Sequence, residues 1–416
     1  MKESGIKFFN LMNRNSLRSL LNNRDFLLMQ IGMSTSRIGT FMQEVAVNWQ
    51  LYQLTKSPLS LGILGLSKFL PVLFFSFFSG LIADIYNRKK IIFLVQVFAL
   101  FNALILAILT ITGKITPFLI YLLVGLEAGL YSFESPARQA MGPTIIAKKD
   151  FPLAVNIMNI TYQTTNFIGP AIAGFIIAFY GTSTVYIINA FSFLAVIIAL
   201  ILMSPLPKIV KKPEFNFNEI KEGFLYVFKT PLIYGSMYID FVTTFFASAS
   251  TLMPIFAIDI LKVGPKELGF LYAAPSVGAV LAGLSFPFLN RIKNKGWLLL
   301  SAVCFFGLNT ILFAISRNFY LSIIFIALSG AGDIVSVIIR NVIRQLNTPD
   351  RLRGRMTAIN MLFYSSGPQL GEAEAGIAAS LMGTPVSVAF GGIATIIASI
   401  IIAVKTPTLL NYKDSD

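Results

Sequence analysis

Long stretches without a charged residue constrain this chain more than any other feature of its sequence. The stretch from Phe151 to Pro207 contains no Asp, Glu, Lys or Arg, and neither does the stretch from Ile91 to Gly113. A helix needs roughly 20 mostly apolar residues to cross a bilayer. Hydrophobic residues make up 55% of the 416 residues and charged residues only 12%, against about 25% charged residues in soluble domains. The sequence therefore predicts an all-α integral membrane protein.

The same pattern, followed along the chain, predicts twelve transmembrane helices in two six-helix halves. The predicted spans lie near 26–53, 59–83, 91–112, 117–135, 153–179, 183–203, 231–258, 268–289, 297–316, 319–339, 355–380 and 384–404. The halves are 26–203 and 231–404, and 204–230 is a cytoplasmic linker with a surface helix. Residues 1–25 are predicted to form an amphipathic segment on the inner leaflet, and 405–416 a cytoplasmic tail.

The basic residues predict the orientation, because Lys and Arg accumulate in cytoplasmic loops near membrane ends. With the N-terminus inside, cytoplasmic segments collect 26 of the 33 basic residues and external loops collect five, while Arg37 and Lys68 fall inside predicted spans. Both termini are therefore expected in the cytoplasm. The net charge of +14 is spread loop by loop and not gathered in one basic domain, which argues against a nucleic-acid-binding surface.

Missing residue types limit the chemistry further. The chain has no His and a single Cys, Cys304, so it cannot form an imidazole-based metal site or a cluster of thiolates, and we expect no cofactor and no metal. A phosphate-binding loop of the Gly-x-x-x-x-Gly-Lys-Ser/Thr type is absent, which argues against an ATP-driven pump. No catalytic constellation is present, so we do not expect an enzyme, and any proton relay must use carboxylates.

The two predicted halves echo each other in sequence. Residues 80–90 end the second span and 283–293 end the eighth, and the two segments share Gly, Leu, Asn, Arg and a final Lys in register. A looser echo pairs Gly169 and Pro170 with Gly367 and Pro368. Parallel six-helix repeats are the architecture of one large transporter class, and the repeat therefore predicts two pseudo-symmetric halves.

These motifs also carry a family resemblance. Gly80-x-x-x-Asp84-x-x-x-Arg88-Lys89-Lys90 resembles the cytoplasmic loop signature of the major facilitator superfamily, and Gly169-Pro170-x-x-x-Gly174 resembles its antiporter motif. Strings within 133–140 and 340–376 are similar to the enterobactin exporter branch, which belongs with the twelve-span drug:proton antiporters. There are two departures: the fourth-span Arg of the superfamily would fall near Gly125 and is missing, and Pro287 replaces the Asp of the second loop copy.

The resemblance implies a transporter of the bacterial cytoplasmic membrane with the major facilitator fold. Such a protein would export a siderophore or drug-like molecule by alternating access in exchange for protons, with lipids around it and as a monomer. An importer of a siderophore or an organic anion with the same fold is an alternative. A membrane receptor or scaffold without transport is a third reading, but a scaffold has no reason to keep carboxylates in the bilayer.

Ionisable residues inside the predicted spans are the candidates for proton coupling or substrate binding, because a charge at the bilayer centre costs about 2.5–3.5 kcal/mol on insertion scales. They are Arg37, Glu44, Glu127, Asp240, Asp333, Glu372 and Glu374. The resemblance implies that the first, fourth, seventh and tenth spans line the pathway. Glu44 and Asp240 could instead lie at a solvated face. Glu372 and Glu374 are two residues apart, so at most one points into the pathway.

Glu127 and Asp333 lie deepest in their spans by residue count, and we favour them as the proton-coupling acids. Arg37 could hold an anionic substrate or tune an acid, and Lys68 could simply extend its side chain to the interface.

A second set of residues is predicted to form a cytoplasmic latch that is closed in one conformational state only. In it, Asp84 either accepts hydrogen bonds from the N-terminal end of another helix or pairs with Arg138, Arg353 or Arg355. The set comprises Gly80, Asp84, Arg88, Lys89, Arg138, Arg353 and Arg355. The plain topological bias of basic residues explains Arg88 and Lys89 equally well. Gly169, Pro170 and Gly174 are expected to permit close helix approach and a kink.

Overall fold

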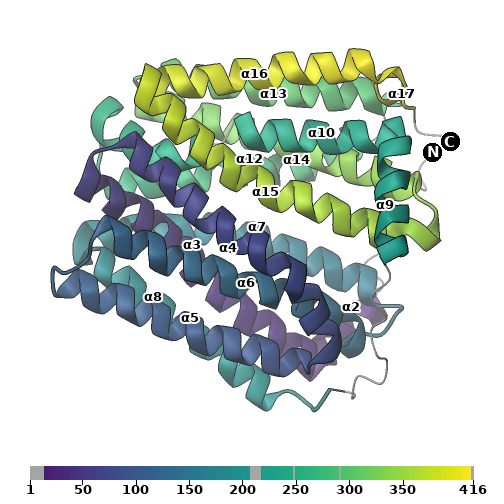
Figure 1. Cartoon of the computed structure of the whole chain (residues 1–416), viewed down its shortest axis with the longest axis horizontal. Helices are drawn as coiled ribbons and strands as arrows, with labels where there is room; N and C mark the ends of the chain where they lie inside the picture. Colours follow the sequence, from purple (N-terminus) through teal and green to yellow (C-terminus); the bar gives the residue numbers. More distant parts are fainter. Residues whose placement is uncertain (1–13, 207–216, 247–248, 290–291, 414–416) are drawn as a thin grey trace. The chain divides into compact units, whose positions relative to one another are not determined.

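The computed structural model describes residues 14–206, 217–246, 249–289 and 292–413, which are helical apart from short connections and one isolated bridge between Asn294 and Lys413 (Figure 1). The helices are α2 (Arg14–Asn22), α3 (Arg24–Thr55), α4 (Pro58–Ile85), α5 (Arg88–Ile111), α6 (Pro117–Ile145), α7 (Phe151–Tyr180), α8 (Thr182–Leu202), α9 (Phe217–Lys229), α10 (Pro231–Phe246), η1 (Ala249–Leu252), α11 (Met253–Ile255), η2 (Phe256–Ile260), α12 (Pro265–Leu289), α13 (Lys295–Ile315), α14 (Phe319–Leu346), α15 (Asp350–Met382), α16 (Thr384–Lys405) and α17 (Pro407–Leu410). The prediction of an all-helical membrane protein is confirmed.

Capping residues and glycines place several helix ends. Asn87 accepts a hydrogen bond from the backbone N–H of Lys89 at the start of α5, as N-cap residues do. Gly181 alone separates α7 from α8, and Gly383 alone separates α15 from α16. Their φ angles of 82° and 87° lie where L side chains rarely fit. Glycine therefore makes both tight helical hairpins possible, and the first joins the predicted spans 153–179 and 183–203.

Nine helical segments within the described residues are both long and apolar enough to cross a membrane. They are α4, α5, α6, α8, Pro231–Ile260, α12, α13, α14 and α16. The predicted spans 26–53, 153–179 and 355–380 correspond to α3, α7 and α15, which are as long but more polar. Within the described residues, length and composition together thus support nine spans, and the count of twelve stays a prediction.

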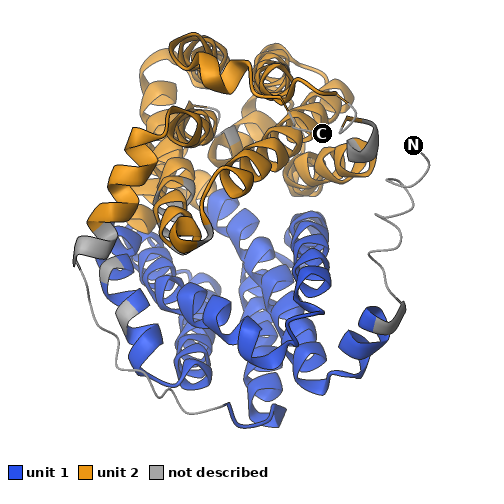
Figure 2. Ribbon diagram, turned by 90° about the vertical axis from the view of Figure 1, so that its right-hand side faces the viewer, with its two compact units in different colours: residues 1–50, 70–213 blue, residues 51–69, 214–416 orange. Residues whose placement is uncertain are grey.

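The chain forms two compact units, shown in blue and orange in Figure 2. Unit 1 comprises Met1–Gln50 and Leu70–Pro213, and unit 2 comprises Leu51–Phe69 and Glu214–Asp416. The units differ from the predicted halves in the segment Leu51–Phe69, which belongs to unit 2. Glycines allow it to lie against α15, because a Cβ on Gly62 would come within 3.0 Å of the Gly376 Cα atom. The pseudo-symmetry of the halves stays a prediction.

Close helix packing against a glycine also occurs at the Gly-Pro pair of each unit. A Cβ on Gly169 of α7 would lie 2.7 Å from the Cβ of Phe41 and 2.9 Å from the carbonyl oxygen of Ile38, both on α3. A Cβ on Gly367 of α15 would likewise collide with the side chain of Thr244 on α10. Pro170 and Gly174 are buried within α7. The close approach expected at Gly169 is therefore observed.

Several predicted segments lie partly outside the described residues. They are residues 1–13, the basic run 208–212 of the linker, Arg291 of the second loop copy, and 414–416. In the described part of the linker, α9 forms where the surface helix is predicted, and its place on the cytoplasmic surface stays a prediction. The predicted tail is structured up to Lys413, because Leu409 of α17 is buried in a core cluster with Ile239 and Leu299. The chain after α16 thus belongs to the fold of unit 2.

Candidate functional site

One face of α6 in unit 1 carries two buried carboxylates. Glu127 and Glu134 are 6% and 7% exposed and lie two helical turns apart, with Tyr131 between them. Glu134 was not among the predicted candidates: it lies one residue before the end of the predicted span 117–135, whereas α6 continues to Ile145. The helical spacing of positions 127, 131, 134 and 138 was the available signal.

Amide side chains from neighbouring helices hold both carboxylates. Gln43 of α3 donates to Glu127 Oε2 at 2.5 Å and accepts a bond from Asn189 of α8 at 2.8 Å. Gln96 of α5 donates to Glu134 Oε2 at 2.7 Å. Buried polar groups are costly unless they are hydrogen-bonded. These amides therefore make it possible for α6 to keep two acids in the core of unit 1.

The hydroxyl of Tyr131 can respond to the protonation of Glu127. It lies 3.4 Å from Glu127 Oε1 and 3.2 Å from the Thr40 hydroxyl on α3. An ionised Glu127 only accepts hydrogen bonds, so the phenol can donate to it. A protonated Glu127 can instead donate to the phenol oxygen, which leaves the phenol free to donate to Thr40. The hydrogen bonds between α6 and α3 therefore depend on the proton.

Two arginines of unit 1, Arg138 and Arg37, lie near Glu134. Arg138 Nε is 3.9 Å from Glu134 Oε1, and the Arg37 guanidinium lies 5.5 Å from the ring centroid of Tyr162 on α7, within range of a cation–π attraction. Glu44 is exposed on α3. Arg37 therefore packs on an aromatic ring of α7.

In unit 2, Asp240 of α10 joins two arginines of α14. Asp240 Oδ1 is 3.1 Å from Arg340 Nη2, and Oδ2 is 3.0 Å from Arg344 Nη1. The three side chains are 4%, 0% and 4% exposed. Both arginines lie on α14, which continues to Leu346. Asp240 is 3% exposed, which argues against the alternative that it reaches water at a solvated face.

Further polar groups complete this cluster. Arg344 donates to Asn341 at 2.8 Å and also to Asn360 of α15. Arg340 Nη2 lies 3.8 Å from Oδ1 of Asp333, whose side chain is 43% exposed. Asp240 and Asp333 thus flank one buried cation, and Asp333 is the more accessible of the two acids.

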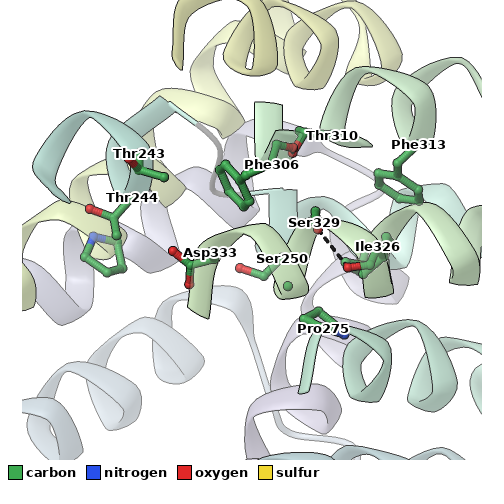
Figure 3. Close-up of a pocket in the computed structure, with 13 residues that line it drawn as sticks. Thr243, Thr244, Ser250, Pro275, Phe306, Thr310, Phe313, Ile326, Ser329 and Asp333 are labelled. Carbon is green, nitrogen blue, oxygen red and sulfur yellow. Dashed lines mark hydrogen bonds between the residues drawn. The ribbon is translucent and has the colours of Figure 1, made fainter. Parts of the chain in front are cut away.

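Asp333 also lines a cavity of about 280 Å³ in unit 2 (Figure 3). Hydroxyl side chains and aromatic rings share the wall, among them Thr243, Thr310, Ser329, Phe306 and Phe313. Figure 3 shows the Asp333 carboxylate among the hydroxyl groups. Of the predicted candidates, Asp333 is therefore the one that lines this cavity.

The remaining candidate acids lie on α15. Glu372 forms an ion pair with Lys68, whose Nζ atom is 2.9 Å from Glu372 Oε2, and both side chains are largely buried. Lys68 therefore pairs with an acid instead of extending to the interface. Glu374 is half-buried.

The predicted latch residues make other contacts. Asp84 is exposed and forms no ion pair with the described residues. Arg88 donates to the carbonyl of Ala140 and Lys89 to that of Met203, each at 2.8 Å, so both tie the start of α5 to other helices. Gly80 faces open space, because a Cβ at this position would meet nothing within 4 Å among the described residues.

In unit 2, Glu222 of α9 accepts from Arg351 at 2.6 Å and also from Arg355. Arg353 is exposed. Sequence reasoning missed Glu222, which fastens the surface helix to α15. A latch through Asp84 stays a prediction for another state.

Comparison with known proteins supplies the family. The profile of the family described as transmembrane secretion effectors matches residues 16–415. The enterobactin exporter EntS of Shigella boydii serotype 4 (strain Sb227) is 25% identical over 376 residues, which cover 89% of each chain. EntS of Escherichia coli (strain K12 / MC4100 / BW2952) is 24% identical over the same share.

Solved structures agree in fold. A bacterial homologue of the human lysosomal transporter Spinster, inward-facing and unoccupied, superposes with a TM-score of 0.72 at 14% identity, covering 94% of this chain and 96% of that one. A bacterial homologue of the iron transporter ferroportin, also inward-facing, gives 0.68 at 16% identity, covering 93% and 98%. The chain therefore belongs to the transmembrane secretion effector family of the major facilitator superfamily and is a multi-pass membrane transporter.

Proposed function

We propose that this transporter exports a siderophore or drug-like molecule from a bacterial cell in exchange for protons, by alternating access in the cytoplasmic membrane. The EntS relatives are enterobactin exporters, which supports both the direction and the substrate class. The bias of basic residues supports cytoplasmic termini. The transporter works as a monomer among lipids, with the small molecule and protons as its partners.

The observation that carries the proposal is the position of Glu127 between helices. A proton can shift a conformational equilibrium only if the two states interact differently with it. Glu127 Oε2 accepts from Gln43 of α3, and Oε1 faces the Tyr131 phenol, which also reaches α3 through Thr40. Protonation of Glu127 reverses its hydrogen bond with Tyr131, so the hydrogen bonding between α6 and α3 changes with the protonation state of Glu127.

Glu127 suits proton coupling better than Asp333 does. Glu127 is buried and held by groups whose hydrogen bonds can reverse, whereas Asp333 opens onto a cavity. An acid on a cavity wall is available to a ligand. We therefore assign the coupling proton to Glu127.

The test uses the purified protein in vesicles with enterobactin as the probe. Glu127→Gln keeps size and hydrogen bonding but removes the titration. It should abolish enterobactin accumulation driven by a pH gradient and spare downhill exchange. Glu267→Gln, which changes an acid of α12 that is not among the candidates, is the matched control and should retain uphill transport. Wild-type accumulation by Glu127→Gln would rule out this acid as the coupling site.

A comparison of whole cells tests the export step separately. Cells that lack the protein should retain a compound that cells with the protein secrete. Equal secretion of all compounds by both strains would contradict export.

A further inference from the structure

The polar wall of the unit 2 cavity is rich in hydrogen-bond acceptors. The Thr243 hydroxyl donates to the carbonyl of Ile239 at 2.5 Å, the Thr310 hydroxyl to that of Phe306 at 3.0 Å, and the Ser329 hydroxyl to that of Ile326 at 2.7 Å. A hydroxyl has one donor and two acceptor lone pairs. Since each of these hydrogens is directed to the backbone of its own helix, these three oxygens can only accept hydrogen bonds from a ligand.

Asp333 is the one charged residue among the described residues that line the cavity. Asp333 presents its carboxylate to the cavity, with 43% of the side chain exposed. The two arginines behind it are buried, and both lie close to Asp240. The two acids, Asp240 and Asp333, balance the charges of the two arginines, but the accessible group of this cluster is the negative Asp333 carboxylate. A ligand in the cavity therefore meets a carboxylate before it meets any cation.

Thr244 and Ser250 add two more hydroxyl groups to the wall. The remaining wall is apolar and includes two aromatic rings, Phe306 and Phe313, together with Met253 and Pro275. Aromatic faces also attract cations. The cavity volume of about 280 Å³ lies near the lower end of the range of about 300–1,000 Å³ for small-molecule sites. A single aromatic ring with a short charged arm fits this volume.

The backbone beside the cavity is irregular. Within Ala249–Ile260 the chain passes from a 3-10 helix through one short α-helical turn into a π-helix, and this stretch contributes Ser250 and Met253 to the wall. Irregular backbone at membrane depth is tolerated where it lines a cavity, and π-helical turns are frequent at functional sites. This second observation indicates that the cavity is a site and not a packing defect.

From these observations we infer that the unit 2 cavity binds a protonated amine carried on an apolar, aromatic body, with Asp333 as its counter-ion. The ammonium donates to Asp333 and to the hydroxyl oxygens of Thr243, Thr310 and Ser329, while the ring packs between Phe306 and Phe313. This inference deepens the proposed function, because it names a substrate class, and it rests on that proposal for the transport step only.

Calorimetry on the full-length protein in lipid nanodiscs tests the binding step. Phenethylamine is the probe, and 3-phenylpropionate is its matched anion, with the same ring and a similar length. The amine should bind at least tenfold more tightly than the anion. Asp333→Asn should weaken amine binding at least tenfold, and Glu267→Gln, an acid of unit 2 outside the cavity, should leave it unchanged.

Equal affinity for amine and anion would overturn the inference, and so would unchanged amine affinity in Asp333→Asn. If Asp333→Asn does not fold, Thr310→Val takes its place, because it removes one acceptor and keeps the shape. It should weaken amine binding severalfold, and unchanged binding would count against the site.

Binding and transport can fail separately. A protein that exports enterobactin but does not prefer the amine refutes the amine site and leaves the proposed function standing. A protein that binds the amine but exports nothing refutes the proposed function and leaves the site standing.

Discussion

Replacing Asp240 with Asn should destabilise unit 2 severely, because one carboxylate balances two buried arginines. Asp240 lies 3.1 Å from Arg340 and 3.0 Å from Arg344. Asn has nearly the same shape but carries no charge. The variant therefore keeps the packing of α10 against α14 and leaves one buried guanidinium without a balancing charge.

The size of the effect follows from burial. Removing one partner of a buried ion pair costs about 3–5 kcal/mol. A loss of 1 kcal/mol lowers the melting temperature by about 2–4 °C in a domain of about 150–250 residues, so we expect a fall of about 6–20 °C. Asp333→Asn is the matched control. Its side chain is half-exposed and 3.8 Å from Arg340, and losing such a pair costs at most about 1 kcal/mol.

Thermal unfolding of the purified variants in one detergent measures both changes. A second substitution, Arg344→Gln, should recover part of the loss in the Asp240→Asn background, because it leaves Arg340 and Asp333 as a balanced pair. If Asp240→Asn and Asp333→Asn melt within about 2 °C of each other, charge balance is not what stabilises this cluster.

Three further predictions concern packing, pH and topology. Gly169→Val should lower the yield of monodisperse protein on size-exclusion chromatography. Gly80→Ala should not lower it, since the new Cβ at position 80 would meet nothing within 4 Å among the described residues. Equal yields of the two variants would contradict the close approach of α7 and α3. The hydrogen bond from Ser19 holds the pKa of Asp150 below its usual value. This contact therefore stabilises the docking of α2 at any pH above the pKa that Asp150 has in the unfolded chain. The stabilisation is lost as the pH falls through the pKa of Asp150 in the folded protein. In Ser19→Ala, proteolysis within α2 should begin at a higher pH than in the wild type, and an unchanged onset would refute the contact. Tags at both termini should react only from the cytoplasm and a reporter at Lys114 only from outside; an external C-terminus would exclude an even number of spans.

Hydropathy predicted where helices cross the membrane but not where they end. The predicted fourth and tenth spans stopped at 135 and 339, whereas α6 and α14 continue to Ile145 and Leu346. Hydropathy reports the apolar stretch, and a helix can continue beyond it when its polar residues find partners. Arg340 and Arg344 lie in the extension of α14 and were therefore missed as buried groups. Glu134 lies one residue before the predicted end of its span and was missed as well.

Partners across helices could not be predicted for a different reason. Helical spacing places Glu372 and Glu374 on different faces, but it does not say which helix each face meets. Lys68 lies on α4, 304 residues from Glu372, and the pair forms because glycines bring that part of α4 close to α15. Such a pairing depends on how two helices cross, and this information is spread over many side chains.

The surroundings of the buried acids explain why they suit different tasks. Asp240 balances two arginines, so protonating it would leave cationic charge without compensation in the core of unit 2. Glu127 accepts from an amide and faces a phenol, and a phenol can turn its hydrogen bond around when a proton arrives. Asp333 has only one distant cation among the described residues and an open cavity beside it. Asp240 is therefore suited to stability, Glu127 to sensing protons, and Asp333 to meeting a ligand, whereas sequence position separated only Asp240 from the other two.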